Sequence, residues 1–240
     1  MDVSIAGWVA IAAVVVVGAT IQGGIGFGMN VVAVPVLALV VPEALPVAAI
    51  VFGIPISIVM TRHERASVDR PGLTRLIAGR IPGSVVGAWI VTVVSVAGLQ
   101  LLVGVMVLAF AVASALAPPI PVVRSTQLAT GVVSGVTGTA VGIGGPPVAL
   151  LYQHRSGPVV RSTLSATFLV GTVLSLTTLL LSGSIGREGL VVGLACAPLV
   201  VAGTLLGRSL HDLLDRGWLR PVVIGFSVLS ALLVLADALR

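Results

Sequence analysis

The chain is built almost entirely from long apolar segments that are separated by short polar loops. Ten such segments can be distinguished, at residues 5–22, 25–41, 44–61, 73–94, 98–117, 125–141, 145–154, 162–182, 189–207 and 218–238. Hydrophobic residues make up 57% of the sequence and charged residues only 9%, whereas a soluble domain carries about 25% charged residues. A full membrane span takes about 20 apolar residues. The segments therefore predict a protein that lies in a lipid bilayer, without room for a soluble catalytic domain.

Only helices suit these segments, although many of them are rich in valine and isoleucine. Within lipid, every backbone N–H and C=O group must be paired internally, which excludes isolated strands, and the alternating pattern of barrel strands is absent. We therefore predict an all-α polytopic membrane protein. The sequence has no P-loop and no HExxH motif, and its single cysteine, Cys196, cannot build a metal cluster. We expect no enzyme activity, no cofactor and no metal site.

The sequence contains an internal repeat. Residues 82–87 are similar to residues 198–203, since each run starts with a proline and ends with a glycine. The chain is accordingly divided into repeat 1 at 1–117, a connector at 118–124 and repeat 2 at 125–240. Each copy holds about five helical segments, and an odd number makes the second copy enter the membrane in the opposite sense. The sequence therefore predicts two inverted-topology repeats.

The distribution of positive charge supports this topology. All 13 basic residues are arginine, and placing the loop at 62–72 in the cytoplasm puts ten of them at or near the inner surface. Arg187 and Arg240 then fall outside, and Arg80 falls within a helix. Cytoplasmic loops are enriched in basic residues, so we attribute the net charge of +5 to topology rather than to nucleic-acid binding. We expect a multi-pass protein of the inner cell membrane.

Two glycine-rich breaks interrupt apolar segments at corresponding places in the two copies, at 23–28 and at 142–147. Paired interruptions of this kind are typical of substrate sites in transporters. The helix that restarts after each break points free N–H groups and the positive end of its dipole towards the midplane, which predicts an anion site. The alternative is that the glycines only allow close helix packing, which is what we expect of the Gly-x-x-x-Gly motifs that start at Gly83, Gly131 and Gly203.

Polar side chains near the breaks are able to hydrogen-bond to an anion. They are Gln22 and Asn30 at the first break, and Ser134, Thr137 and Thr139 at the second. The alternative for serine and threonine is that their hydroxyls bond back to helix carbonyls. Both interpretations stay open.

Arg80 lies within the apolar segment 73–94. An arginine inside a membrane is costly and usually faces a cavity or a partner. The alternative is that its side chain stretches to the inner interface. The interior of the apolar segments contains no acidic residue, so no buried carboxylate is available for a proton relay.

The two breaks, their spacing from Pro35 and Pro147, and the duplicated arrangement resemble the TauE/SafE (TSUP) family of sulfite and organosulfonate exporters over nearly the whole chain. The resemblance implies an integral membrane permease for sulfur-containing anions. It also implies a site role for residues of both breaks, which are Gly24, Gly26, Gly28, Gly142, Gly144, Gly145 and Pro146. The first break departs from the family's usual run of consecutive glycines, because Phe27 interrupts it.

We therefore predict a permease that moves a small sulfur-containing anion, sulfite or an organosulfonate, by alternating access at a midplane site between the two breaks. The predicted substrate-binding residues are Gln22, Gly24, Gly26, Gly28, Asn30, Arg80, Thr137, Thr139, Gly142, Gly144, Gly145 and Pro146. Its partners are expected to be the anion and the lipid bilayer, and the packing glycines also suit a homodimer. Two alternatives stay open: a carrier or channel for another small anion or solute, and a membrane scaffold subunit that transports nothing.

Overall fold

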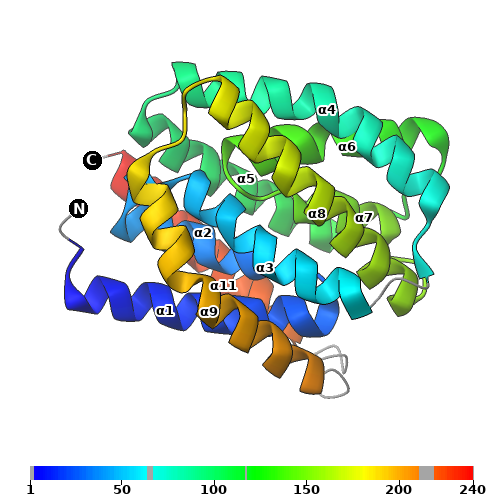
Figure 1. The fold of residues 1–240 in the computed structure, drawn as a ribbon, viewed down its shortest axis with the longest axis horizontal. Coiled ribbons are helices and arrows are strands. Elements are labelled where there is room, and N and C mark those ends of the chain that lie inside the picture. Colours follow the sequence, from blue (N-terminus) through cyan, green and yellow to red (C-terminus); the bar gives the residue numbers. More distant parts are fainter. Residues whose placement is uncertain (1–2, 64–66, 117, 211–218, 240) are drawn as a thin grey trace.

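The computed structural model describes residues 3–63, 67–116, 118–210 and 219–239. The helices in this part of the chain are α1 (Ile5–Ile25), α2 (Met29–Val40), the short 3-10 helix η1 (Pro42–Ala44), α3 (Val47–His63), α4 (Arg70–Val93), α5 (Val96–Leu116), α6 (Arg124–Ala140), α7 (Gly145–Tyr152), α8 (Gly157–Leu181), α9 (Arg187–Ser209) and α11 (Leu219–Ala238) (Figure 1). The described residues contain no strand, which confirms the predicted all-α class. Each apolar segment predicted from the sequence overlaps one of these α-helices over most of its length.

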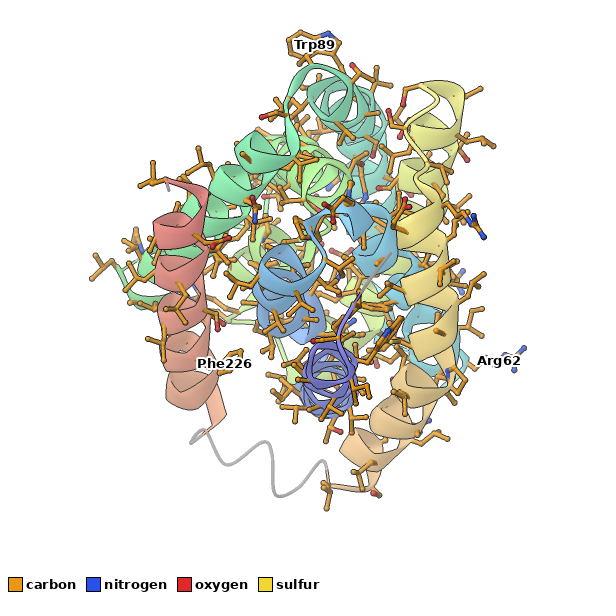
Figure 2. The ribbon with its side chains drawn as sticks, turned by 90° about the vertical axis from the view of Figure 1, so that its left-hand side faces the viewer. Arg62, Trp89 and Phe226 are labelled. Carbon is orange, nitrogen blue, oxygen red and sulfur yellow. The ribbon has the colours of Figure 1, made fainter. Side chains whose placement is uncertain are left out.

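Five of the described helices are long and apolar enough to cross a membrane, and they are α1, α4, α5, α8 and α9. Large apolar side chains project outward from the bundle. Leu181 is 82% exposed and Trp89 is 61% exposed, and Figure 2 shows Trp89 pointing away from the other helices. Exposed apolar surface of this kind suits contact with lipid. The chain is a membrane protein, whereas the threading of every segment stays a prediction.

Two pairs of helices are joined by short segments that contain glycine. We call residues 26–28, between α1 and α2, the first junction, and residues 141–144, between α6 and α7, the second junction. Gly26 and Gly28 have φ angles of 98° and 119°, and Gly142 has a φ angle of 78°. These angles lie in the left-handed region, which residues with a β-carbon rarely adopt. Glycine therefore allows the chain to leave one helix and begin the next within a few residues.

The two halves of the chain are interlocked, because α4 lies along α6 and α1 lies along α9 (Figure 1). A β-carbon at Gly83 or Gly131 would clash with a carbonyl oxygen of the facing helix, and the same holds for Gly207 on α9. The Gly-x-x-x-Gly motifs thus serve close helix packing, as predicted. Each of these helix pairs takes one member from residues 1–117 and one from residues 125–240. This exchange fits two inverted repeats, and the repeat division itself stays a prediction.

A group of polar side chains, which we call the Asp69 cluster (Asp69, Arg75, Gln127 and Tyr152), ties the start of α4 to α6 and to the end of α7. Asp69 caps α4, because its Oδ1 accepts a hydrogen bond from the N–H of Gly72 at 3.0 Å. Its Oδ2 accepts from the Tyr152 hydroxyl at 2.8 Å and from Gln127 Nε2 at 3.3 Å. Arg75 Nη1 donates to Gln127 Oε1 at 2.9 Å. The cluster holds the far end of the helix that begins at the second junction.

Candidate functional site

A cavity lies inside the bundle, and both junctions contribute to its wall. Its volume is about 60 Å³, which is room for a small ion or a few water molecules. Eight of the residues predicted for the site line it, and they are Gln22, Gly28, Asn30, Arg80, Gly142, Gly144, Gly145 and Pro146. The fold therefore brings the two glycine breaks and the intramembrane arginine to one place, although they are far apart in the sequence.

Arg80 is the only charged side chain among the described residues that line the cavity. It is 4% exposed and lies on α4, next to glycines that let α6 approach closely. Its Nη1 donates to the Ser134 hydroxyl at 2.8 Å, and that hydroxyl donates to the carbonyl of Gly144 at 2.6 Å. Its Nε is buried and has no partner among the described residues. The Arg80 side chain thus lies buried at the cavity, and its contact with a substrate stays a prediction.

Three glycines make room for the guanidinium group of Arg80. A β-carbon at Gly171 on α8 would overlap the guanidinium. A β-carbon at Gly138 would lie 2.7 Å from its Nη2, and one at Gly144 would lie 3.1 Å from its Nη1. The side chain can lie across the cavity only because α6, α8 and the second junction present no side chains there.

The positive charge of Arg80 has no acidic counterpart in the cavity, because no aspartate or glutamate lies among the described lining residues. Burying a cation without a partner is strongly unfavourable, and intramembrane charges usually pair with one another or mark an ion pathway. The arrangement therefore favours binding of an anion beside Arg80, where the anion supplies the missing negative charge.

Asn30 connects the two junctions. It lies in the first turn of α2, and its Nδ2 donates to the carbonyl of Ala49 at 2.9 Å and to the carbonyl of Gly142 at 2.7 Å. Its Oδ1 is buried and has no hydrogen-bond partner among the described residues. The side chain thus holds the second junction with its nitrogen and leaves one acceptor unpaired at the cavity.

The start of α2 offers few free N–H groups to a ligand. Gln22 Oε1 accepts from the N–H of Met29 at 3.1 Å and so bridges the first junction. The N–H of Val31 donates to the carbonyl of Gly28 at 3.1 Å. Since these donors are already used, Gln22 acts here as a cap for α2.

The start of α7 is also poor in donors, because Pro146 and Pro147 carry no N–H. The sequence favoured a site made mainly from helix ends. In the structure the unpaired donors among the described lining residues are instead the Nε of Arg80 and the hydroxyl of Ser57. The role of the helix ends in binding stays a prediction.

Four of the predicted site residues are not among those that line the cavity, and they are Gly24, Gly26, Thr137 and Thr139. A β-carbon at Gly26 would lie 3.0 Å from Cγ of Arg161, so this glycine packs against α8. Thr137 donates back to the carbonyl of Val133 at 3.0 Å, which is the alternative foreseen for hydroxyl side chains. Thr139 pairs with the hydroxyl of Ser175 at 2.8 Å. Substrate contact by these four residues stays a prediction.

Sequence reasoning missed lining residues from α3 and α8. Ser57 lines the cavity, and its hydroxyl is buried without a partner among the described residues. Thr172 and Ser175 on α8 also line it. The sequence offers no signal that singles out Thr172 and Ser175, because α8 contains several other serines and threonines.

The sequence model of one family, described as sulfite exporter TauE/SafE, matches residues 10–234, which is nearly the whole chain. No curated protein and no solved structure gives a significant match.

Proposed function

The chain belongs to the sulfite exporter TauE/SafE family, and from this premise we propose that it carries a small sulfur-containing anion, sulfite or an organosulfonate, through the cavity at Arg80. The family is one of exporters and not of enzymes. The single observation that carries the proposal is a buried arginine in a cavity whose described lining residues include no carboxylate. An anion that enters this cavity gains a charge-assisted hydrogen bond.

The proposed ligands on the protein are the Nε of Arg80 and the hydroxyl of Ser57, both of which lack partners among the described residues. Gly138, Gly144 and Gly171 act as positioning residues, because they leave the space in which the guanidinium lies. Unpaired buried polar groups are costly, and a bound oxyanion would pair with both donors at once.

We further propose that transport proceeds by alternating access, with the two junctions as corresponding parts of two inverted repeats. Both junctions line the same cavity, and Asn30 bonds directly from one to the other. The halves are interlocked through α1 with α9 and through α4 with α6, so a movement of one half necessarily changes the other. A location in the inner cell membrane is part of this proposal and rests on the arginine distribution.

The test is binding and flux with the purified protein. Sulfite, methanesulfonate, sulfate, a neutral solute and a cation are compared by their effect on the melting temperature, since a ligand of the folded state raises it. Flux of the ligand that binds is then measured in proteoliposomes. We expect a sulfur-containing anion to bind, and Arg80→Gln to weaken its binding and flux at least about tenfold, because a hydrogen bond to a charged group is lost.

Arg70→Gln is the matched control, because Arg70 lies on the same helix but is exposed. It should leave binding and flux close to the unmodified protein. If Arg80→Gln binds and transports the anion as well as the control does, the site is not at Arg80. Binding of only the neutral solute or the cation would favour a carrier for another solute, and no flux of any solute would favour a scaffold.

A further inference from the structure

The unpaired polar atoms of the cavity are of two opposite kinds. The Nε of Arg80 can only donate a hydrogen bond, and the Oδ1 of Asn30 can only accept one. Both atoms are buried, and neither has a partner among the described residues. The hydroxyl of Ser57 can do either. A ligand that satisfies the whole cavity must therefore both accept and donate.

The orientation of the Asn30 amide is fixed by its surroundings. Its nitrogen lies 2.9 Å from the carbonyl oxygen of Ala49 and 2.7 Å from that of Gly142. Turning the amide over would bring Oδ1 to the same distances from two carbonyl oxygens, and acceptors without a proton between them repel. The acceptor consequently stays on the side that the protein leaves unpaired.

We propose that the transported substrate is a monovalent oxyanion that carries a hydroxyl group, and that the Oδ1 of Asn30 accepts the hydrogen bond from that hydroxyl. This inference rests on the proposed function, since it describes the substrate of the same cavity. The anionic oxygens face Arg80, and the hydroxyl faces Asn30. Asn30 is thus a specificity-determining residue, whereas Arg80 binds any small anion.

Charge favours this substrate over two related ones. A divalent oxyanion without a proton has only acceptors, so it leaves Asn30 unpaired and meets a single arginine among the described lining residues. An ammonium group can donate to Asn30, but its positive charge has no carboxylate among those residues to balance it. A hydroxyl donates without bringing a charge.

The experiment uses three sulfonates with the same number of non-hydrogen atoms. They are 2-hydroxyethanesulfonate, propane-1-sulfonate and 2-aminoethanesulfonate, and their Kd values are measured with the full chain in lipid nanodiscs. The hydroxyl compound should bind at least about tenfold more tightly than the propyl compound, because a site built to pair with a hydroxyl rejects an analogue that lacks it. It should also bind more tightly than the amino compound.

The hydroxyl can sit on carbon or directly on sulfur, as in hydrogensulfite. A fourth arm separates these sources by measuring sulfite binding below and above the pH at which hydrogensulfite loses its proton, with methanesulfonate as a reference that does not titrate. If sulfite binds more tightly below this pH than above it, and methanesulfonate does not, the substrate is one whose hydroxyl sits on sulfur. A preference confined to 2-hydroxyethanesulfonate assigns the hydroxyl on carbon.

Equal binding of the hydroxyl and propyl compounds, with both lost in Arg80→Gln, overturns this inference and leaves the proposed function standing. Tightest binding of the amino compound also overturns it. If none of the three sulfonates and no form of sulfite binds to the unmodified protein, the proposed function itself is wrong.

Two variants locate the acceptor. Asn30→Ser should reduce the ratio between the hydroxyl and propyl Kd values to about one, whereas Ser57→Ala should keep that ratio. Asn30→Ser also loses the bonds to two carbonyls, so its melting temperature is measured alongside. If this variant does not fold, the comparison of ligands on the unmodified protein decides alone. If Ser57→Ala instead brings the ratio of the two Kd values to about one, the substrate hydroxyl pairs with Ser57, and the role proposed for Asn30 is wrong.

Discussion

The first and second junctions both contain left-handed glycines but are stabilised in different ways. At the first junction, Gln22 of the preceding helix accepts from the N–H of Met29, so the segment is completed by its own neighbours. At the second junction, Ser134 donates to the carbonyl of Gly144 and at the same time accepts from Arg80 on α4. The hydrogen bonds of the second junction therefore include one from Arg80, which belongs to the other half of the chain.

The two junctions therefore contribute different groups to the cavity. The second junction is linked to the positive charge of Arg80 through Ser134. A ligand that binds Arg80 would therefore also change the hydrogen bond between Arg80 and Ser134. The first junction supplies Asn30, whose nitrogen reaches across to Gly142. Under the proposed function, an anion bound between them would contact a side chain tied to each junction. A ligand shifts a conformational equilibrium when such contacts differ between the two states.

The largest expected effect comes from removing the space for the guanidinium. Gly171→Ala adds a β-carbon that overlaps Arg80, so the side chain must leave its place at the second junction. We expect anion affinity and flux to fall by about 100-fold, which is the upper range for a lost hydrogen bond to a charged group. Gly225→Ala on α11 is the control, because nothing lies within 4 Å of its added β-carbon. Equal flux in the two variants would show that the position of Arg80 is unimportant.

Ser134→Ala removes the hydroxyl that links Arg80 to the second junction, but the glycines around the guanidinium still leave its space open. Arg80 loses its partner on Nη1, and the carbonyl of Gly144 loses its donor. We expect about tenfold weaker anion binding and a lower melting temperature, since a buried group left unpaired costs about 1–3 kcal/mol. Ser182→Ala, at an exposed serine after α8 whose hydroxyl bonds to Leu179 and Ser184, should leave the anion affinity unchanged. Unchanged anion affinity in Ser134→Ala would mean that the second junction and the cation act independently.

The sequence predicted the helices well, because lipid leaves helices as the only choice for long apolar segments. Its boundaries were less accurate where tertiary packing decides. α1 runs on to Ile25 instead of ending at residue 22, since Gly23 stays helical and packs against the backbone of Thr204. α8 begins at Gly157 instead of residue 162, since Pro158 is suited to the first turn of a helix.

The candidate site was predictable only in part. Arg80 and the glycine breaks stand out locally, because a charge within an apolar helix is rare and because the glycines of each break are clustered. Ser57 and Thr172 do not stand out, since a serine or threonine in a membrane helix usually bonds to its own backbone. That Gly171 faces Arg80 depends on how α8 crosses α4, and no local pattern specifies this.

A smaller effect is expected at the first junction. Gln22→Leu removes the acceptor for the N–H of Met29, and we expect a destabilisation of about 1 kcal/mol, the usual cost of losing a helix cap. Gln22→Glu keeps an acceptor oxygen but adds a negative charge to the cavity, so it should weaken anion binding. Anion affinity should fall less in Gln22→Leu than in Ser134→Ala. If anion affinity falls more in Gln22→Leu than in Ser134→Ala, the first junction and not the second acts together with Arg80.

The smallest effect on anion binding is expected at the far end of α7, where Tyr152→Phe removes two hydrogen bonds from the Asp69 cluster, the one to Asp69 and the one from Gln127. Asp69 Oδ2 still accepts from Gln127, and its Oδ1 still caps α4, so we expect a loss of about 1–3 kcal/mol in stability. Anion affinity should stay within about twofold of the unmodified protein, because Ser134 and not the Asp69 cluster is the contact that completes the second junction. Melting temperature and Kd measured on the same preparation check both parts. A fall in affinity as large as that of Ser134→Ala would show that Arg80 depends on the whole of α7. The contrast between the two junctions would then extend from the cavity to the Asp69 cluster.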